Sequence, residues 1–340
     1  MADEHACRRV LAAYGADCQP LRIEPLSSAG GFSGARFWRV SAPAGVLCLR
    51  RWPREHPDRQ QLEFIQAVLW HVHQEGFRLV PLPLETRTHA GYVCEAGHLW
   101  ELTPWLPGEA DYHRSPSVAR LRAAATALAR FHQAAASFPL PHRGPGTAPG
   151  LRSRLKRLEV WSDARLVQVS AAITAGDWPE LAERARRLVP LFARAAESVA
   201  DVLRQALPIQ ASLEPCIRDI WHDHVLFVGD EVSGLIDFGA LRVDSVATDV
   251  ARLLGSLCGD DSAAWLEALN AYDSVRPLSS GEALLVTTFD RSNVLLSGMS
   301  WLEWIYLEGR AFENRAAICE RLDANLARLE HLVGQTAFDI

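Results

Sequence analysis

The sequence is poor in lysine and lacks several features that mark other classes of protein. Lys156 is the only lysine, so every other basic residue is an arginine. The seven cysteines are odd in number and widely spaced, with no CxxC pair, which argues against a disulfide framework or a zinc knuckle. No apolar run reaches the ~18 residues of a membrane-spanning helix. A function that needs a lysine therefore has a single candidate side chain.

The charge balance excludes two kinds of partner. The 35 basic and 41 acidic residues give a formal net charge of -6, which is too mild and too dispersed to favour nucleic acid or an anionic membrane. Residues 1–5 are acidic and polar, unlike the basic and then apolar start of a signal peptide. We therefore expect a soluble, cytoplasmic protein with a small-molecule partner. The composition gives no indication of its oligomeric state.

The first hundred residues have the pattern of an antiparallel sheet with one main helix. Apolar side chains at positions 62, 65, 69 and 72 recur at steps of three and four, which predicts an amphipathic helix over residues 60–75. A short helix is predicted at residues 4–14. Strands, separated by Gly and Pro turns, are predicted at residues 21–25, 35–40, 46–52, 91–95 and 98–102.

The rest of the chain is predicted to be mostly helical. Residues 103–108 contain two prolines and a glycine, which suit a stiff connector, so we predict domains at 1–103 and 104–340. With 340 residues, 49% of them hydrophobic, the chain is long enough for both. A strand, turn and strand lie within residues 219–238. Helices are predicted at residues 117–137, 151–162, 163–174, 178–206 and from 248 onward.

Acidic residues at the ends of predicted strands indicate a catalytic site. Asp219 follows an arginine, His224 comes five positions later, and residues 236–239 read Ile-Asp-Phe-Gly after a short hairpin. In the kinase-like fold this order supplies a base for the substrate hydroxyl, a metal-binding residue and a second metal-binding residue. We therefore predict Asp219 as the catalytic base and Asp237 as the ligand of a metal that bridges the phosphates of ATP.

These residues resemble the aminoglycoside phosphotransferase and choline kinase family, the small-molecule branch of the protein-kinase-like fold. Its Ile-Asp-Phe-Gly is unchanged at 236–239, and residues 217–227 are similar to its His-Gly-Asp loop and the strand that follows. The resemblance runs along most of the chain. It implies an α+β, two-lobed fold, with ATP and magnesium used to transfer the γ-phosphate to a hydroxyl, or an amine, of a small molecule. Asp249 is expected to be structural, holding backbone N–H groups at a helix start.

The resemblance also implies a nucleotide site in the first domain. A loop matches the family's Gly-Gly-x-Ser pattern, in which glycine lets the backbone approach phosphate oxygens closely. A plain hairpin turn is the alternative, because the loop is no regular GxGxxG. The loop residues that we expect to contact nucleotide are Gly30, Gly31, Ser33 and Gly34.

Three further residues are expected to contact the nucleotide or to position a residue that does. Arg50 stands where the third strand of kinases carries its lysine, so the charge is kept but the ammonium becomes a planar fork. Glu63, on the following helix, is its expected ion-pair partner. Thr103 and the two residues before it resemble the hinge that pairs with adenine. The alternative for Arg50 and Glu63 is a solvated surface charge.

Two departures from the family pattern leave other functions open. His224 replaces the metal-binding asparagine, and imidazole suits manganese better than magnesium, so both metals are candidates. With the lysine also lost, a nucleotide-binding protein without turnover is the first alternative. A metallohydrolase built on residues 222–224 is the second, since His-x-His is a common ligand spacing. Residues 301–308 offer aromatic and acidic groups to a cationic ligand, or else pack in the core.

Overall fold

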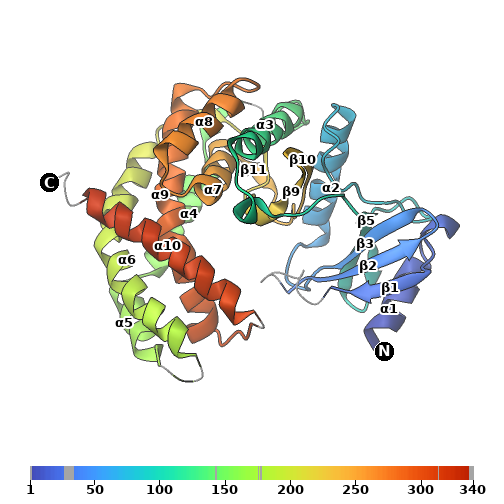
Figure 1. The fold of residues 1–340 in the computed structure, drawn as a ribbon, viewed down its shortest axis with the longest axis horizontal. Coiled ribbons are helices and arrows are strands. Elements are labelled where there is room, and N and C mark those ends of the chain that lie inside the picture. The colour runs from blue at the N-terminus through green and yellow to red at the C-terminus, as the bar shows by residue number, and fades with distance from the viewer. Residues whose placement is uncertain are drawn as a thin grey trace. The chain divides into compact units, whose positions relative to one another are not determined.

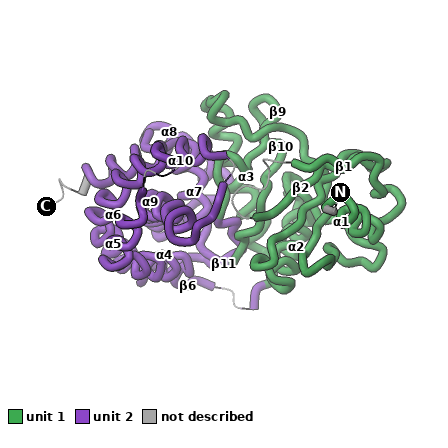
Figure 2. The backbone as a smooth tube through the Cα atoms, turned by 90° about the horizontal axis from the view of Figure 1, so that it is seen from below, with its two compact units in different colours: residues 1–139, 219–242 green, residues 140–218, 243–340 purple. Residues whose placement is uncertain are grey.

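The computed structural model describes residues 2–26, 34–141, 144–174, 176, 178–312 and 314–336. The chain forms two compact units, coloured separately in Figure 2: residues 1–139 with 219–242, and residues 140–218 with 243–340. The segment that carries Asp219 and Asp237 therefore belongs to the same unit as the N-terminal sheet. The predicted division at residues 103 and 104 stays a prediction.

An antiparallel sheet forms the N-terminal part of the first unit, as the sequence predicts (Figure 1). Its five strands lie in the order β1-β2-β3-β5-β4. Alternation along β2 buries Trp38 and Val40, which pack with Leu11 of the first helix and Trp100 of β5. The elements are α1 (Ala2–Leu11), β1 (Arg22–Pro25), β2 (Arg36–Ala42), β3 (Gly45–Arg51), β4 (Val93–Glu95) and β5 (His98–Pro104).

Two helices and a hairpin complete the first unit. Helix α2 (Arg59–Gln74) begins where the Asp58 carboxylate accepts from the Gln61 N–H, and the chain leaves it through Gly76 at φ +95°. It packs on α3 (Val118–Ala135), which in turn contacts the hairpin. The hairpin is made of β9 (Val225–Val228) and β10 (Glu231–Leu235), and the short 3₁₀ turns of this unit are Ala16–Cys18, Tyr112–Arg114 and His222–His224.

The second unit is mostly helical. Its helices are α4 (Pro149–Val160), α5 (Asp163–Ala172), α6 (Pro179–Ala206), α7 (Ala247–Cys258), α8 (Ser262–Asp273), α9 (Ser280–Leu302) and α10 (Arg315–Thr336). Its short strands are β6 (Pro145–Thr147), β7 (Gln210–Ser212), β8 (Glu214–Cys216) and β11 (Arg242–Asp244), paired as β6 with β7 and β8 with β11. These small strands were not predicted, because three residues are too short for a period-two pattern to be visible.

Helix α9 lies at the centre of the second unit, in contact with α6, α7 and α10. Its Gly298 allows the close approach: a Cβ there would lie 2.2 Å from a methyl carbon of Leu188 on α6 and 2.4 Å from Oδ1 of Asn325 on α10. A side chain at this position would displace the ends of the Leu188 and Asn325 side chains. Buried apolar residues of α9, among them Leu285, Phe289 and Leu295, contribute to the core of this unit.

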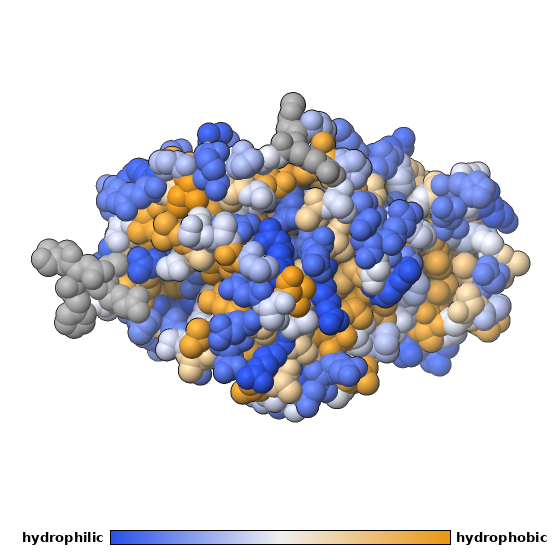
Figure 3. All heavy atoms as spheres, turned by 90° about the horizontal axis from the view of Figure 1, so that it is seen from above, coloured by the Kyte–Doolittle hydropathy of each residue, from blue (hydrophilic) through white to orange (hydrophobic). Residues whose placement is uncertain are grey.

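Polar and apolar residues are mixed on the face of the molecule that Figure 3 shows. The most exposed large apolar side chains, such as Leu21, Val167 and Leu266, are far apart in the sequence, and scattered examples of this kind are ordinary. Among the described helices, none combines the length and the apolar character needed to cross a membrane.

Candidate active site

The two predicted aspartates flank the hairpin of the first unit. Asp219 precedes the 3₁₀ turn that leads into β9, and Asp237 follows β10 by two residues. His224 connects the two ends: its Nδ1 lies 2.7 Å from the Asp219 carbonyl oxygen, and its own carbonyl accepts from the Ile236 N–H at 3.0 Å. The backbone of both predicted motifs therefore meets at His224, the first through its ring and the second through its carbonyl.

Asp237 is paired with Arg50. An N–H of the Arg50 guanidinium donates to Oδ1 of Asp237 at 2.9 Å, and the side chains are 11% and 35% exposed. Burial raises the pKa of Asp237, but the Arg50 charge, the neighbouring His224 and hydrogen bonds from Arg50 and the Gly239 N–H together outweigh it and lower the pKa to about 2. The residue also has φ +60°, a left-handed conformation that costs a non-glycine residue energy. The carboxylate is thus held ionised at a fixed point, as a metal ligand requires.

The expected ion pair between Arg50 and Glu63 is not formed. Glu63 is exposed and accepts a hydrogen bond from the Tyr92 hydroxyl at 2.7 Å, while Arg50 reaches Asp237. The buried acid beside Arg50 is instead Glu101, its cross-strand neighbour between β3 and β5. The physical reason is burial, because Glu63 lies on the solvent side of α2 and Glu101 on the covered side of the sheet.

Glu101 is held by a residue of α2 that sequence reasoning missed. Gln66 is buried, three positions after Glu63, and donates to Oε2 of Glu101 at 2.7 Å. Burial raises the pKa of Glu101, and the hydrogen bond from Gln66 and the charge of Arg50 oppose that rise. The available signal was an acid at an otherwise apolar stretch of strand, where an unpaired charge is rare.

Both ring nitrogens of His224 have hydrogen-bond partners in this arrangement. Nε2 of His224 accepts a hydrogen bond from the Trp221 indole N–H at 3.0 Å, because an indole N–H can only donate. Nδ1 of His224 donates to the Asp219 carbonyl oxygen, which can only accept. Nε2 lies 3.6 Å from Oδ2 of Asp237. The two acceptor atoms are close enough to share one divalent cation, provided that the Trp221 indole releases Nε2. The residues therefore fit a metal site in which Asp237 supplies the negative charge.

The neighbouring residues 222 and 223 do not join that site. The His222 ring lies 4.0 Å, centroid to centroid, from the ring of His113, and its Nε2 is 3.4 Å from the Asp223 carboxylate. His224 faces Asp219 and Asp237 instead. Both histidines of the His-Asp-His run also contact the Trp221 ring, while His222 packs on His113 and His224 lies beside Asp237.

The predicted adenine contact lies inside a strand. Thr103 is buried in β5 opposite Cys48 of β3, and the pairing continues to Trp105, whose N–H donates to the Val46 carbonyl at 3.0 Å. On the other edge, the Leu102 carbonyl already accepts from the Leu84 N–H at 2.8 Å. The backbone around Thr103 therefore takes part in the sheet, and its role as an adenine contact stays a prediction.

The predicted phosphate loop is only partly visible. Gly30, Gly31 and Ser33 lie outside the described residues. Gly34 leads into β2 with φ +77°, and a Cβ there would meet no atom closer than 3.9 Å. Its left-handed backbone, rather than lack of space, is what favours glycine at this position.

In the second unit, Asp249 fixes the chain directly before Asp219. Its two carboxylate oxygens accept from the N–H groups of Ile217 and Arg218, at 2.6 Å each. Arg218 has φ +68°, at a position where the family has glycine, and its Nε lies 3.5 Å from the buried Asp244 carboxylate. Asp249 thus binds backbone N–H groups as expected, but those of the residues directly before Asp219 rather than those of a helix start.

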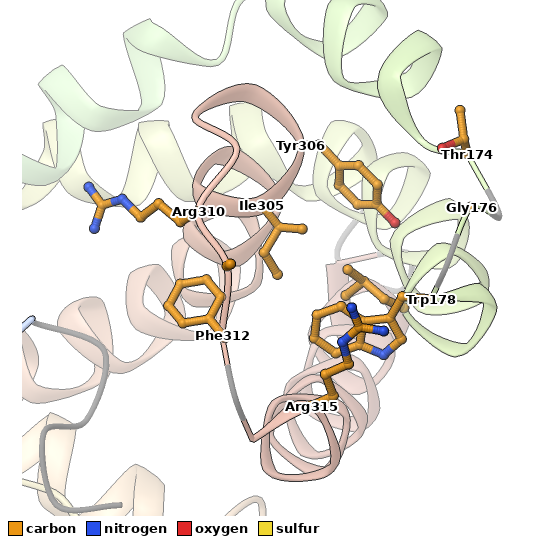
Figure 4. Close-up of a pocket in the computed structure, with 10 residues that line it drawn as sticks. Thr174, Gly176, Trp178, Ile305, Tyr306, Arg310, Phe312 and Arg315 are labelled. Atoms are coloured by element: carbon orange, nitrogen blue, oxygen red, sulfur yellow. The ribbon is translucent and has the colours of Figure 1, made fainter. Parts of the chain in front are cut away.

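The second unit also contains an aromatic pocket of about 290 Å³, shown in Figure 4. It lies between the α5–α6 connection and a π-helix (Glu303–Leu307), which replaces the regular helix expected there. Trp178 and Tyr306 line it, and the Arg315 guanidinium lies 5.1 Å from the centre of the Trp178 ring. Glu303 is buried and paired with Arg157 and Arg165, so its charge is not available to a cationic ligand.

Comparison with known proteins gives a family and several related kinases. A family model described as the phosphotransferase enzyme family, APH, matches residues 22–284. The chain belongs to this family. A homoserine kinase of Methylocella silvestris is 26% identical over 281 residues, which cover 81% of this chain and 79% of that relative. The match confirms the family and the small-molecule kinase activity expected from the motifs.

Solved structures of this family confirm the fold class. A spectinomycin phosphotransferase, APH(9)-Ia, solved with ADP and spectinomycin, superposes with a TM-score of 0.68 at 11% identity, covering 95% of each chain. The amicoumacin kinase hAmiN, solved with AMP-PNP, Ca²⁺ and amicoumacin, superposes with a TM-score of 0.67 at 12% identity, covering 99% of this chain and 94% of the other. At these identities the likeness shows the protein-kinase-like fold alone.

Proposed function

We propose that this phosphotransferase moves the γ-phosphoryl group of ATP to a hydroxyl of a small molecule, with Asp219 as catalytic base and Asp237 as the principal metal ligand. The observation that supports these roles most is the ionised Asp237, fixed 2.9 Å from Arg50 at the far end of the hairpin that follows Asp219. In such reactions the protein contributes mainly position and charge. Here the charged side chains lie on strand β3 and at the two ends of a short hairpin, and these elements fix their positions.

Asp219 takes the hydroxyl proton in this scheme. As the acceptor oxygen forms its bond to the γ-phosphorus, the bond to the ADP oxygen breaks, and the proton of the hydroxyl passes to the Asp219 carboxylate. The His224 imidazole orients this residue through its hydrogen bond to the Asp219 carbonyl. A divalent cation, when bound at Asp237, neutralises charge on the phosphates. Magnesium and manganese are both candidates, because His224 offers nitrogen where the family has an amide oxygen.

Arg50 and the chain after β5 are the proposed nucleotide contacts. The Arg50 fork has further N–H groups for phosphate oxygens beyond the one given to Asp237. Because the Trp105 N–H points to β3, the groups of Pro104 and Leu106 point to the opposite edge of the strand. We place adenine there, accepting from the Leu106 N–H and donating to the Pro104 carbonyl, one to three residues beyond Thr103.

The acceptor is proposed to be a small hydroxyl compound, with homoserine as the first candidate because the matched relative is a homoserine kinase. Turnover of ATP should be measured over a panel containing homoserine, spectinomycin and simple amino alcohols. Asp219→Asn should lower kcat by at least about 100-fold while ATP affinity changes less than about twofold, since the carboxylate serves the acceptor. Asp223→Asn, four residues away in the same loop, is the matched control and should stay active.

Each result of this experiment distinguishes between functions. Equal turnover by the parent and Asp219→Asn would remove Asp219 from the mechanism. ATP binding without turnover on any acceptor would favour the nucleotide-binding alternative, in which the loss of the lysine and of the asparagine has ended catalysis. Turnover that requires no nucleotide would contradict the kinase proposal.

A further inference from the structure

An aromatic sandwich surrounds the Arg50 guanidinium. The guanidinium carbon lies 3.2 Å from the centre of the Trp52 ring and 5.0 Å from the centre of the Phe37 ring. Phe37 is the cross-strand neighbour of Arg50 on β2, and Trp52 directly follows the end of β3, two residues after Arg50. A planar guanidinium stacks on such a face, whereas an ammonium has no plane to stack.

The Trp52 ring connects Arg50 to the segment that carries Asp237. It is 3% exposed, and a Cβ placed on Gly239, two residues after Asp237, would lie 3.0 Å from Cζ3 of the ring. The indole N–H has no partner among the described residues. The Trp52 ring is therefore held in place by packing. Its face contacts the Arg50 guanidinium, and its edge packs close to Gly239, two residues after Asp237.

No helix carboxylate performs this task in the described part of the chain. Glu63 is engaged with Tyr92, and α2 contributes Gln66, whose amide binds Glu101 rather than Arg50. The orientation of the guanidinium must then come from Asp237 at one end, from Glu101 on the neighbouring strand and from the two nearby rings. Of these, only the rings constrain its plane.

We propose that Trp52, assisted by Phe37, is a positioning residue that orients the Arg50 guanidinium toward the nucleotide phosphates, in place of an ion pair from the helix. This inference rests on the proposed nucleotide role of Arg50 and adds the residue that makes an arginine suitable there. It has a direct consequence: the phosphate part of nucleotide affinity depends on an aromatic ring that contacts no nucleotide.

The test compares ATP with adenosine, because only ATP has phosphates. Calorimetry with magnesium present gives the ratio of the two affinities for the parent, Arg50→Ala, Trp52→Leu and Trp52→Phe. Trp52→Leu should lower the ratio about tenfold, as expected for a desolvated cation–π contact, and Trp52→Phe should retain most of it. In an Arg50→Ala background, Trp52→Leu should change the ratio less than about twofold.

Two further variants control for general damage to the sheet. Trp38→Leu removes another buried indole, 5.8 Å from the Arg51 guanidinium, and should lower thermal stability without changing the affinity ratio. Phe37→Leu alters the outer, half-buried ring and should lower the ratio about two- to threefold, which keeps the proposal testable if Trp52→Leu does not fold.

The outcomes separate this inference from the function on which it rests. A ratio lowered by Arg50→Ala but unchanged by Trp52→Leu and Phe37→Leu would overturn the positioning role and leave the kinase proposal intact. A ratio unchanged by Arg50→Ala would show that Arg50 does not hold phosphate, which overturns both its nucleotide role and this inference. An equal fall in Trp38→Leu would mean that the sheet, and not the sandwich, sets the ratio.

Discussion

The ion pair between Arg50 and Asp237 should contribute measurably to stability as well as to the site. Neutralising either partner leaves the other charge unpaired in a mostly buried place. The two single substitutions together should therefore cost more stability than the double substitution does. A double-mutant cycle of Arg50→Ala and Asp237→Asn isolates the interaction, because contacts that each residue makes elsewhere cancel.

The magnitude follows from the pKa of Asp237. A fall from its ordinary 3.8 to about 2 corresponds to about 2.4 kcal/mol at full value, a net figure that includes the opposing effect of burial and the contributions of His224 and the Gly239 N–H beside that of Arg50. Because the Asp237 side chain is 35% exposed, solvent screening reduces this, and we expect a coupling of about 1 kcal/mol. The pKa is depressed in the folded state, so the contribution is present above about pH 4 and is lost as pH falls through about 2.

Urea unfolding of the four proteins at pH 7 and pH 4.5 gives the coupling. It should be nearly the same at the two pH values, because both lie above the ordinary pKa of the carboxyl group. In Arg50→Ala, burial is no longer opposed by the guanidinium, so the Asp237 pKa should rise and stability should then improve as the pH falls from 7 to 4.5. A coupling near zero at pH 7 would refute the reasoning.

Three other substitutions test the remaining parts of the site. Asp237→Ala should abolish metal-dependent ATP binding in calorimetry, and unchanged metal–ATP affinity would exclude it as the ligand. If His224 binds the metal, activity should be higher with manganese than with magnesium and His224→Asn should shift the ratio toward magnesium; an unchanged ratio of turnover would exclude ligation. Arg218→Ala should be less stable to urea than Arg218→Gly by about 1 kcal/mol, because only glycine relieves the left-handed backbone; equal stabilities would mean that no strain is stored there.

Much of the fold was predictable from local patterns. The stripe of apolar residues in α2, the Pro and Gly turns between strands and the hairpin after Asp219 each depend on neighbours within about ten residues. The π-helix at Glu303–Leu307 was not predictable, since its apolar and aromatic residues fit a regular helix equally well. The membership of the compact units was not predictable either, because it depends on which distant segments pack together.

The candidate site also has parts that the sequence predicted and parts that it did not. The positions of Asp219 and Asp237 follow from a contiguous motif, and Asp249 was correctly expected to bind backbone N–H groups. The partner of Arg50 could not be obtained from spacing, because Glu63 and Gln66 lie one turn apart on α2 and only burial decides which one faces the sheet. The adenine contact at Thr103 stays a prediction, and what the sequence does not show is where strand pairing ends along β5.

The presence of arginine at position 50 has two physical explanations, and the structure favours one. In a chain whose single lysine is the exposed Lys156 on α4, a general preference for arginine would replace lysine everywhere, with no change around it. A cleft adapted to the guanidinium would instead surround it with planar groups, and Trp52 and Phe37 do so. Under that explanation Arg50→Lys keeps the charge but loses the stacked plane, so it should lower ATP affinity relative to adenosine. The loss should shrink in a Trp52→Leu background, where there is no longer a ring for the guanidinium to use.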